Sequence, residues 1–155
     1  MKMNLPKKII SGGQTGVDRA ALDVARELKI PCGGWCPKGR KAEDGVIDAI
    51  YPLQETPSEN YSQRTEWNVR DADGLLILNT GDLAGGTALA VAYAKKYSKP
   101  YFLIDLTETL NKKTFQQWLQ KNNIAILSVG GPRESHKPGF IYAKAKMIFK
   151  NLLER

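Results

Sequence analysis

The sequence has no long apolar run and no recognisable leader. No stretch of its 155 residues approaches the roughly 20 consecutive apolar residues that a membrane-spanning helix needs. The first residues, MKMNLP, lack the apolar core of a signal peptide. The sequence therefore predicts a cytoplasmic protein with no membrane contact.

Cysteine and histidine are scarce, which argues against redox and structural-zinc chemistry. Three residues separate Cys32 from Cys36, whereas thioredoxin-like redox sites have a C-x-x-C spacing. His136 is the single histidine, so the chain has too few soft ligands for a structural zinc site. We expect two reduced thiols and no metal ion ligated by the protein.

Motifs that recognise nucleic acid are also missing, although the net charge is positive. The chain carries 23 Lys and Arg against 16 Asp and Glu, and the resulting net charge of +7 attracts anions. Aromatic residues are not interleaved with the basic ones, as stacking on single strands requires, and no helix-turn-helix or zinc-finger pattern occurs. We expect a small phosphorylated ligand and no specific nucleic-acid partner.

Apolar runs that alternate with amphipathic segments indicate the fold class. The run Leu75–Leu78 fits a central parallel strand that is buried on both faces. Strands that alternate with helices give a parallel sheet covered on both sides. We predict one domain over residues 1–155, an α/β protein with a three-layer, Rossmann-like, doubly wound parallel sheet. The expected strands are 7–10, 29–35, 75–79, 101–106 and 124–129, and the expected helices are 20–28, 62–72, 88–96, 111–120 and 139–153.

Three of these strands end in glycine-rich turns. Glycine lets the backbone approach a ligand, and the first N–H groups of the following helix bind anions. In doubly wound sheets, ligands bind beyond the carboxyl ends of the strands, so we expect the three turns around one cleft. The spacing is neither G-x-G-x-x-G nor G-x-x-x-x-G-K-[ST], and tight turns without a ligand remain the alternative. The turns are Gly12-Gly13-Gln14-Thr15-Gly16, Gly85-Gly86-Thr87 and Gly130-Gly131-Pro132-Arg133.

Basic side chains near these turns could neutralise a phosphate. The segment 36–62 shows little periodicity, and a loop of this length inside a compact domain is often functional. It carries Lys38 and Arg40, which we expect over the cleft unless the segment is simply a solvated surface loop. Arg64 follows on the next predicted helix, and Arg133 ends the third turn. Arginine is the side chain best matched to forked contacts with phosphate.

Ordered motifs along nearly the whole chain form a specific set. They are Gly12–Asp23, Gly33–Arg40, Ala42–Gly45, Tyr61 with Arg64–Glu66, Gly85–Thr87 and Gly130–Arg133. Together they resemble the family of molybdenum carrier proteins, also called molybdenum cofactor carrier proteins. The resemblance implies a Rossmann-like fold that is distantly related to the lysine-decarboxylase-like phosphoribohydrolase (LOG) group.

The resemblance also implies a ligand. Carriers of this kind bind the molybdenum cofactor (molybdopterin), a pterin with a phosphate and a dithiolene-bound metal. They form homo-oligomers and store this cargo or hand it to a molybdoenzyme or a cofactor-synthesis partner. The likeness to the phosphoribohydrolases is weaker, because their Pro-Gly-Gly-x-Gly-Thr turn precedes a catalytic glutamate. The helix predicted over 88–96 contains no Glu, which argues against their hydrolase activity.

Two functions stay open at this point. The first is a non-catalytic carrier that holds a phosphorylated pterin or nucleotide-like anion at the glycine-rich strand exits, where Asp18 either caps a helix or accepts a hydrogen bond from the ligand. Its predicted binding residues are Gly12, Gly13, Gln14, Thr15, Gly16, Asp18, Arg19, Lys38, Arg40, Arg64, Gly85, Gly86, Thr87 and Arg133. The alternative is a nucleotide-processing enzyme, such as an N-glycosidic hydrolase of nucleoside monophosphates, which needs a carboxylate in the cleft. The candidate carboxylates are Asp18, Glu43, Asp44, Glu66 and Asp82.

Overall fold

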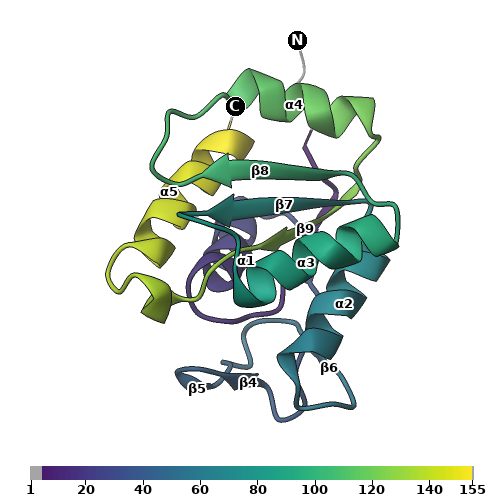
Figure 1. Ribbon diagram of the computed structural model, residues 1–155, viewed down its shortest axis with the longest axis vertical. Helices are drawn as coiled ribbons and strands as arrows, with labels where there is room; N and C mark the ends of the chain where they lie inside the picture. The colour runs from purple at the N-terminus through teal and green to yellow at the C-terminus, as the bar shows by residue number, and fades with distance from the viewer. Residues whose placement is uncertain (1–4, 155) are drawn as a thin grey trace.

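A five-stranded parallel sheet forms the centre of the computed structural model, which describes residues 5–154 (Figure 1). The strand order is β2-β1-β9-β7-β8, and every neighbouring pair is parallel. The residues MKMN, on which the expectation of no signal peptide partly rested, lie outside the described residues. The strands are β1 (Lys8–Ile10), β2 (Cys32–Gly33), β7 (Gly74–Asn79), β8 (Tyr101–Asp105) and β9 (Ile126–Gly130).

Strand β7 shows why this sequence builds a sheet covered on both faces. It is buried along almost its whole length and pairs with β8 on one side and β9 on the other. Successive side chains of a strand point to opposite faces. Leu76 and Leu78 therefore join one hydrophobic cluster, and Leu75 and Ile77 join another. The expectation of a central parallel strand in this run is confirmed.

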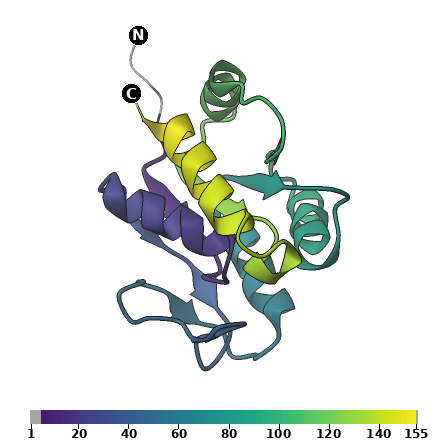
Figure 2. The same ribbon diagram turned by 90° about the vertical axis from the view of Figure 1, so that its left-hand side faces the viewer.

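Helices cover both faces, so the predicted three-layer, doubly wound fold is confirmed. Viewed toward the carboxyl ends of the strands, α1 and α5 lie on one side of the sheet and α3 on the other (Figure 2). No helix within residues 5–154 has the length and apolar character needed to cross a membrane. The layer of α1, α4 and α5 faces the layer of α2 and α3 across the sheet. Their bounds are α1 (Val17–Glu27), α2 (Tyr61–Asp71), α3 (Gly85–Lys96), α4 (Lys112–Lys121) and α5 (Ile141–Leu153).

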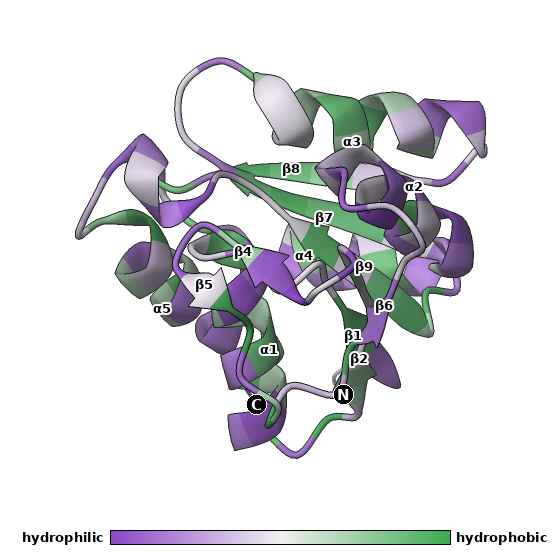
Figure 3. Ribbon diagram, turned by 90° about the horizontal axis from the view of Figure 1, so that it is seen from below, coloured by the Kyte–Doolittle hydropathy of each residue, from purple (hydrophilic) through white to green (hydrophobic). Residues whose placement is uncertain are grey.

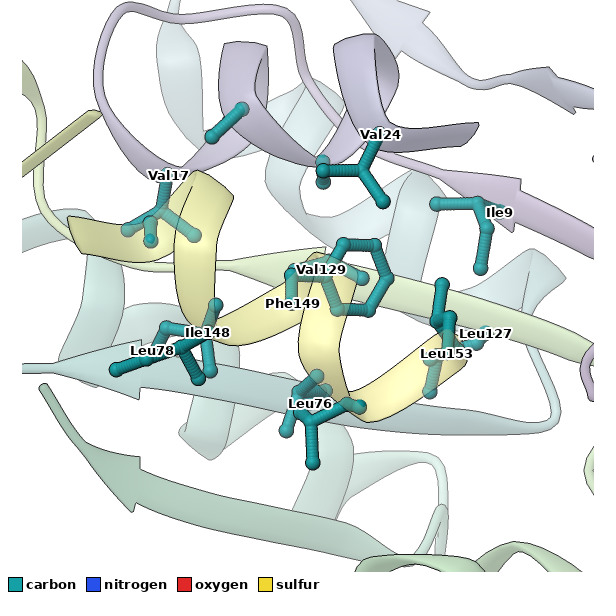
Figure 4. Close-up of a cluster of buried hydrophobic side chains, with 14 of the residues drawn as sticks. Ile9, Val17, Val24, Leu76, Leu78, Leu127, Val129, Ile148, Phe149 and Leu153 are labelled. Atoms are coloured by element: carbon teal, nitrogen blue, oxygen red, sulfur yellow. The ribbon is translucent and has the colours of Figure 1, made fainter. Parts of the chain in front are cut away.

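The larger hydrophobic cluster lies between the sheet and the layer of α1, α4 and α5. Figure 4 shows Phe149 of α5 among side chains of α1 and the sheet, such as Val24 and Val129. Phe149 and Val24 are fully buried, and Val129 is nearly so. Burial of a side chain of this size contributes about 1.5–3 kcal/mol. The regular apolar spacing in the predicted helix 139–153 thus reflects packing against the sheet.

The segment between Gly34 and the start of α2 is more ordered than its lack of periodicity suggested. It contains two small sheets, one with β3 and β6 in parallel and one with β4 and β5 in antiparallel. Strand β4 is coloured hydrophilic in Figure 3, whereas β7 and β8 of the main sheet are hydrophobic. Ile47 and Leu53 anchor the segment in a cluster with Leu22 of α1. The short strands are β3 (Trp35–Cys36), β4 (Lys41–Ala42), β5 (Gly45–Val46) and β6 (Gln54–Glu55).

The structure moves several predicted boundaries. Helix α1 begins at Val17 instead of residue 20, and α5 begins at Ile141 instead of residue 139. The strand expected over 29–35 is divided at Gly34, where φ is +127° and a Cβ would lie 2.4 Å from the carbonyl oxygen of Ser11. Helix α3 begins at Gly85 instead of residue 88, so its glycine turn is part of the helix. The short 3-10 helix η1 (Glu134–His136) was not expected.

At the carboxyl end of the sheet, Gly131 lies very close to the backbone of β7. A Cβ at this position would lie 2.2 Å from the carbonyl oxygen of Leu78 and 2.6 Å from Cγ2 of Val17. We expect Gly131→Ala to lower the free energy of unfolding by about 2–3 kcal/mol, because the added methyl group would clash with the backbone of Leu78, which the sheet holds in place. Urea denaturation followed by circular dichroism measures the change.

Gly86→Ala is the matched control. A Cβ at Gly86 meets no atom within 4 Å, so the same substitution should change the stability by less than about 1 kcal/mol. A Gly131→Ala variant as stable as the wild type would show that Gly131 and Leu78 are less closely packed than described.

Candidate functional site

A cavity of about 340 Å³ lies at the carboxyl ends of the central strands. Gly12 follows β1, Asn79 ends β7, and the stretch from Ser128 to Arg133 runs out of β9; all of them line the cavity. Helices α2 and α3 supply another part of the wall, and Gln14 and Asp18, near the start of α1, supply a further part. Because β9 pairs with both β1 and β7, the three glycine-rich exits meet here, as expected from the sequence.

The cavity brings together only part of the predicted binding set. Polar residues that the sequence did not single out, among them Asn68 and Asn79, complete its lining. Asn79 ends an apolar strand, and this position is the signal that could have identified it. The predicted residues that line the cavity are Gly12, Gln14, Asp18, Arg64, Gly85, Gly86, Thr87 and Arg133. Those outside its lining are Gly13, Thr15, Gly16, Arg19, Lys38 and Arg40.

The first glycine turn does not offer the row of free N–H groups that was expected of it. The N–H of Gln14 donates to Oδ2 of Asp18 at 3.4 Å, and the N–H of Thr15 donates to Oε1 of Gln14 at 3.0 Å. The N–H of Val17 donates to the carbonyl of Pro132 at 3.2 Å. The N–H of Gly13 donates to Oγ of Ser11 at 3.4 Å, so three of the five N–H groups from Gly12 to Gly16 are engaged inside the protein. These bonds argue against a backbone phosphate cradle at this turn.

Gly13 and Gly16 serve packing instead. Both have positive φ, +76° and +79°, which favours glycine. A Cβ on Gly13 would lie 2.5 Å from Leu53, and a Cβ on Gly16 would lie 2.5 Å from the carbonyl oxygen of Pro132. These glycines allow the segment 34–60 and the exit of β9 to close over the turn.

The second glycine turn is different, because it opens α3 directly into the cavity. Within residues 5–154, no side chain caps α3, whose N-cap is Ala84. Gly85 and Gly86 are exposed, and a Cβ on either would meet no atom within 4 Å. An uncapped helix N-terminus presents unpaired N–H groups with the positive end of the helix dipole behind them. The α3 N-terminus is therefore the part of the site best suited to an anion.

Gln14 is held firmly and leaves one buried donor without a partner. Its side chain is 5% exposed, and Oε1 accepts from the N–H groups of Thr15 at 3.0 Å and Glu43 at 2.8 Å. These two bonds fix which end of the amide is oxygen. Within the described part of the chain, Nε2 has no hydrogen-bond partner. Such a buried donor beside a cavity is normally satisfied by a water molecule or a ligand.

Asp18 is a buried carboxylate in the same wall. It is 5% exposed, and its Oδ2 lies 3.9 Å from Nη1 of Arg64 and 3.4 Å from the N–H of Gln14. Burial raises the pKa of Asp18, and the positive charges of Arg64 and Arg19 only partly oppose this effect. Because the N-cap of α1 is Gly16 and this one bond is long, Asp18 is at most a weak cap.

Two arginines place positive charge beside the α3 N-terminus. The guanidinium carbons of Arg64 and Arg133 each lie 5.3 Å from the centroid of the Tyr61 ring. Nε of Arg64 is buried and has no partner among the described residues. Arg133 comes no closer than 4.0 Å to the carboxylate of Glu43. Both arginines therefore retain hydrogen-bonding capacity for an anion.

Arg40 and Lys38 do not reach the cavity. Arg40 instead donates to the backbone carbonyls of Ile47, Asp48, Tyr51 and Leu53 over distances of 2.8–3.2 Å. This guanidinium ties the loop to itself, which corrects the expectation that it neutralises a phosphate.

Arg19 is likewise engaged elsewhere. It donates to the carbonyl of Gly13 and pairs with Asp44 at 2.9 Å. Lys38 is exposed and also lies outside the lining. Of the basic residues predicted to bind the ligand, only Arg64 and Arg133 therefore bring positive charge to the cavity.

Neither cysteine lines this cavity. The thiols of Cys32 and Cys36 are unpaired, and burial raises the pKa of both. Within residues 5–154, no group of three or more histidine, cysteine or acidic side chains is arranged to hold a metal ion.

A parallel sheet wound in both directions, with a cavity at the carboxyl ends of its central strands, defines a Rossmann-like α/β protein. The chain belongs to the circularly permutated YpsA SLOG family, whose model matches residues 9–153. It is also similar to the crystal structure of a "putative molybdenum carrier protein" from Syntrophus aciditrophicus SB. The two share 45% sequence identity with a TM-score of 0.91, and the match covers 96% of each chain. The resemblance inferred from the ordered motifs is thereby confirmed; a comparison with curated proteins finds no match.

The four hydrogen bonds of Arg40 give the first prediction for this region. We expect Arg40→Ala to lower the free energy of unfolding by about 2–3 kcal/mol, because carbonyls of the loop lose their donor. For a chain of this length, that corresponds to a melting temperature lower by roughly 4–12 °C. Thermal denaturation measures the melting temperature. Lys38→Ala, in the same loop, is the control and should leave the melting temperature unchanged. Equal melting temperatures for both variants would contradict the assigned role of Arg40.

Glu43 gives a pH-dependent prediction. Its carboxylate accepts hydrogen bonds from the hydroxyl of Thr15 and from the N–H and hydroxyl of Ser135, the latter two at 3.1 and 2.6 Å. Although burial opposes ionisation, these bonds hold the pKa of Glu43 below its usual value. The stability they contribute is present above the ordinary carboxyl pKa and is lost as pH falls through the lowered pKa of the folded state.

We therefore expect Glu43→Gln to reduce stability at pH 7 and to flatten the loss of stability between pH 6 and pH 3. Urea denaturation at a series of pH values gives both quantities. Glu108→Gln, at an exposed carboxylate, is the matched control. A wild type and a Glu43→Gln variant with parallel pH profiles would disprove this linkage.

Proposed function

We propose that this protein is a carrier that binds a phosphorylated pterin or nucleotide-like anion, with the molybdenum cofactor as its cargo. The observation that carries the proposal is the uncapped N-terminus of α3, which opens into a cavity flanked by Arg64 and Arg133. The name of the similar protein from Syntrophus aciditrophicus SB supports molybdenum as part of the cargo. A cavity of about 340 Å³ is in the range of small-ligand sites.

The phosphate of the ligand lies at Gly85, Gly86 and Thr87 in this proposal. Their N–H groups donate to its oxygens, while the guanidinium groups of Arg64 and Arg133 balance its charge. Each charge-assisted hydrogen bond adds about 1.5–3 kcal/mol. The protein supplies no ligand to the metal, because the dithiolene of the cofactor already holds it.

The delivery of cargo completes the proposal. A homo-oligomer in the cytoplasm stores the cofactor and passes it to a molybdoenzyme or a cofactor-synthesis partner. The carboxyl end of the sheet, which carries the cavity, is the face through which such transfer takes place.

A nucleotide-processing enzyme is the second candidate, and Asp18 favours it. A buried carboxyl group with a raised pKa is the type of group that acts as a general acid. Of the candidate carboxylates, Asp18 and Asp82 line the cavity, whereas Glu43, Asp44 and Glu66 do not. Release of free base from AMP or GMP would favour this function over the carrier.

The carrier proposal predicts which ligands stabilise the fold. We expect the molybdenum cofactor to raise the unfolding free energy by about 2.7 kcal/mol at a hundredfold excess over Kd, because only the folded state binds it. Molybdate, which lacks the pterin and the phosphate, should have no effect. Thermal-shift titration with the cofactor, molybdate, AMP and GMP tests this expectation.

Gly86→Val should abolish the shift, because its side chain fills the space that the phosphate needs. The matched control is Ala92→Val, at an exposed position of the same helix. Both variants should melt near the wild-type temperature without ligand. A full ligand-induced shift in Gly86→Val would place the anion elsewhere.

A further inference from the structure

The wall opposite the α3 N-terminus carries hydrogen-bonding groups that phosphate recognition leaves unused. Nε2 of Gln14 is a buried donor without a partner within residues 5–154, and both bonds to Oε1 prevent the amide from turning round. The donor is therefore a fixed feature of the wall. A ligand atom that meets it must be an acceptor.

Asp18 supplies the complementary acceptors next to Gln14. An ionised carboxylate has two oxygens with about four acceptor positions. The side chain of Asp18 receives one long hydrogen bond, 3.4 Å from the N–H of Gln14, and the Arg64 guanidinium stays 3.9 Å away. Most of its acceptor capacity therefore remains available on the cavity side of α1, where Asp18 lines the wall.

Together these groups present two acceptors beside one donor. The complementary ligand edge has two adjacent N–H donors followed by a carbonyl acceptor. A 2-amino-4-oxopyrimidine ring has this edge, which guanine and pterin share, whereas the corresponding edge of adenine offers one amino donor and one ring-nitrogen acceptor. We propose, building on the carrier function above, that Gln14 and Asp18 recognise the 2-amino-4-oxo edge of the ligand ring while its phosphate lies at the α3 N-terminus.

The strand order gives these two subsites a matching separation. Gln14 and Asp18 follow β1, and α3 follows β7, with β9 between the two strands. The strands that lead to the two subsites are therefore two strand spacings, about 10 Å, apart in the sheet. A fused ring joined to a phosphate through one sugar-sized spacer has a comparable length. Arg64 lies 3.9 Å from Asp18 and lines the same cavity, so its guanidinium is near the ring subsite.

Calorimetric titration of the wild type tests the ring subsite without any mutation. The probes are GMP, IMP, AMP, phosphorylated 6-hydroxymethylpterin and ribose 5-phosphate. IMP differs from GMP only by the missing 2-amino group, so we expect GMP to bind at least tenfold more tightly than IMP or AMP. The pterin probe should bind at least tenfold more tightly than ribose 5-phosphate, which has no ring base. The tighter ligand of GMP and the pterin probe identifies which ring the site prefers.

Asp18→Asn replaces acceptors by a donor with almost no change in size. We expect it to remove the advantage of GMP over IMP and to leave ribose 5-phosphate binding within twofold of the wild type. Gln14→Glu, which removes the donor, should weaken GMP at least tenfold as an independent check. Gly86→Val should weaken every phosphorylated probe, and Ala92→Val none.

The outcomes separate this inference from the carrier function. Equal affinity for GMP, IMP and AMP, unchanged by Asp18→Asn, would overturn the ring subsite and leave the phosphate site intact. If none of the phosphorylated probes binds, including ribose 5-phosphate, the proposed function fails together with the subsite. A loss of ribose 5-phosphate binding in Asp18→Asn would also overturn the inference, because it would place the phosphate at Asp18.

Discussion

The pairing of β9 with both β1 and β7 is the constraint on which the site depends. Strand β9 comes after β1 and β7 in the chain but lies between them in the sheet. The carboxyl end of β9 therefore lies between the carboxyl ends of β1 and β7. Just after β9, Gly131 lies so close to the backbone of β7 that it has no room for a side chain. One cavity therefore collects residues from three parts of the chain.

The two strand–glycine–helix turns look alike in sequence and differ in what they can bind. The first is covered by the segment 34–60, and its N–H groups donate to Asp18, Gln14 and Pro132. The second lies at the open side of the sheet and begins α3 without a side-chain cap. A backbone N–H group binds a ligand only when the protein has not already satisfied it. Coverage by other segments thus divides the cavity into an end with an uncapped helix N-terminus and a polar wall.

The arginines show the same dependence on surroundings. Arg40 meets four carbonyls of its own loop, whereas Arg64 lies on α2 against Tyr61 and keeps a buried Nε without a partner among the described residues. Both side chains have the same chemistry. Only the second lines the cavity.

The sequence by itself determined the fold class and the strand exits. The apolar run of β7, the apolar spacing of α5 and the glycine-rich turns are local patterns, and periodicity and turn chemistry act over a few residues. Only the tertiary structure decided which groups face the cavity. The bonds of Glu43 to Thr15 and Ser135, and of Arg40 to its loop, join positions whose contacts no local pattern specifies. Hydrogen-bond partners are set by which segments meet in space, so the free donors of α3 and of Gln14 became visible only in the folded chain.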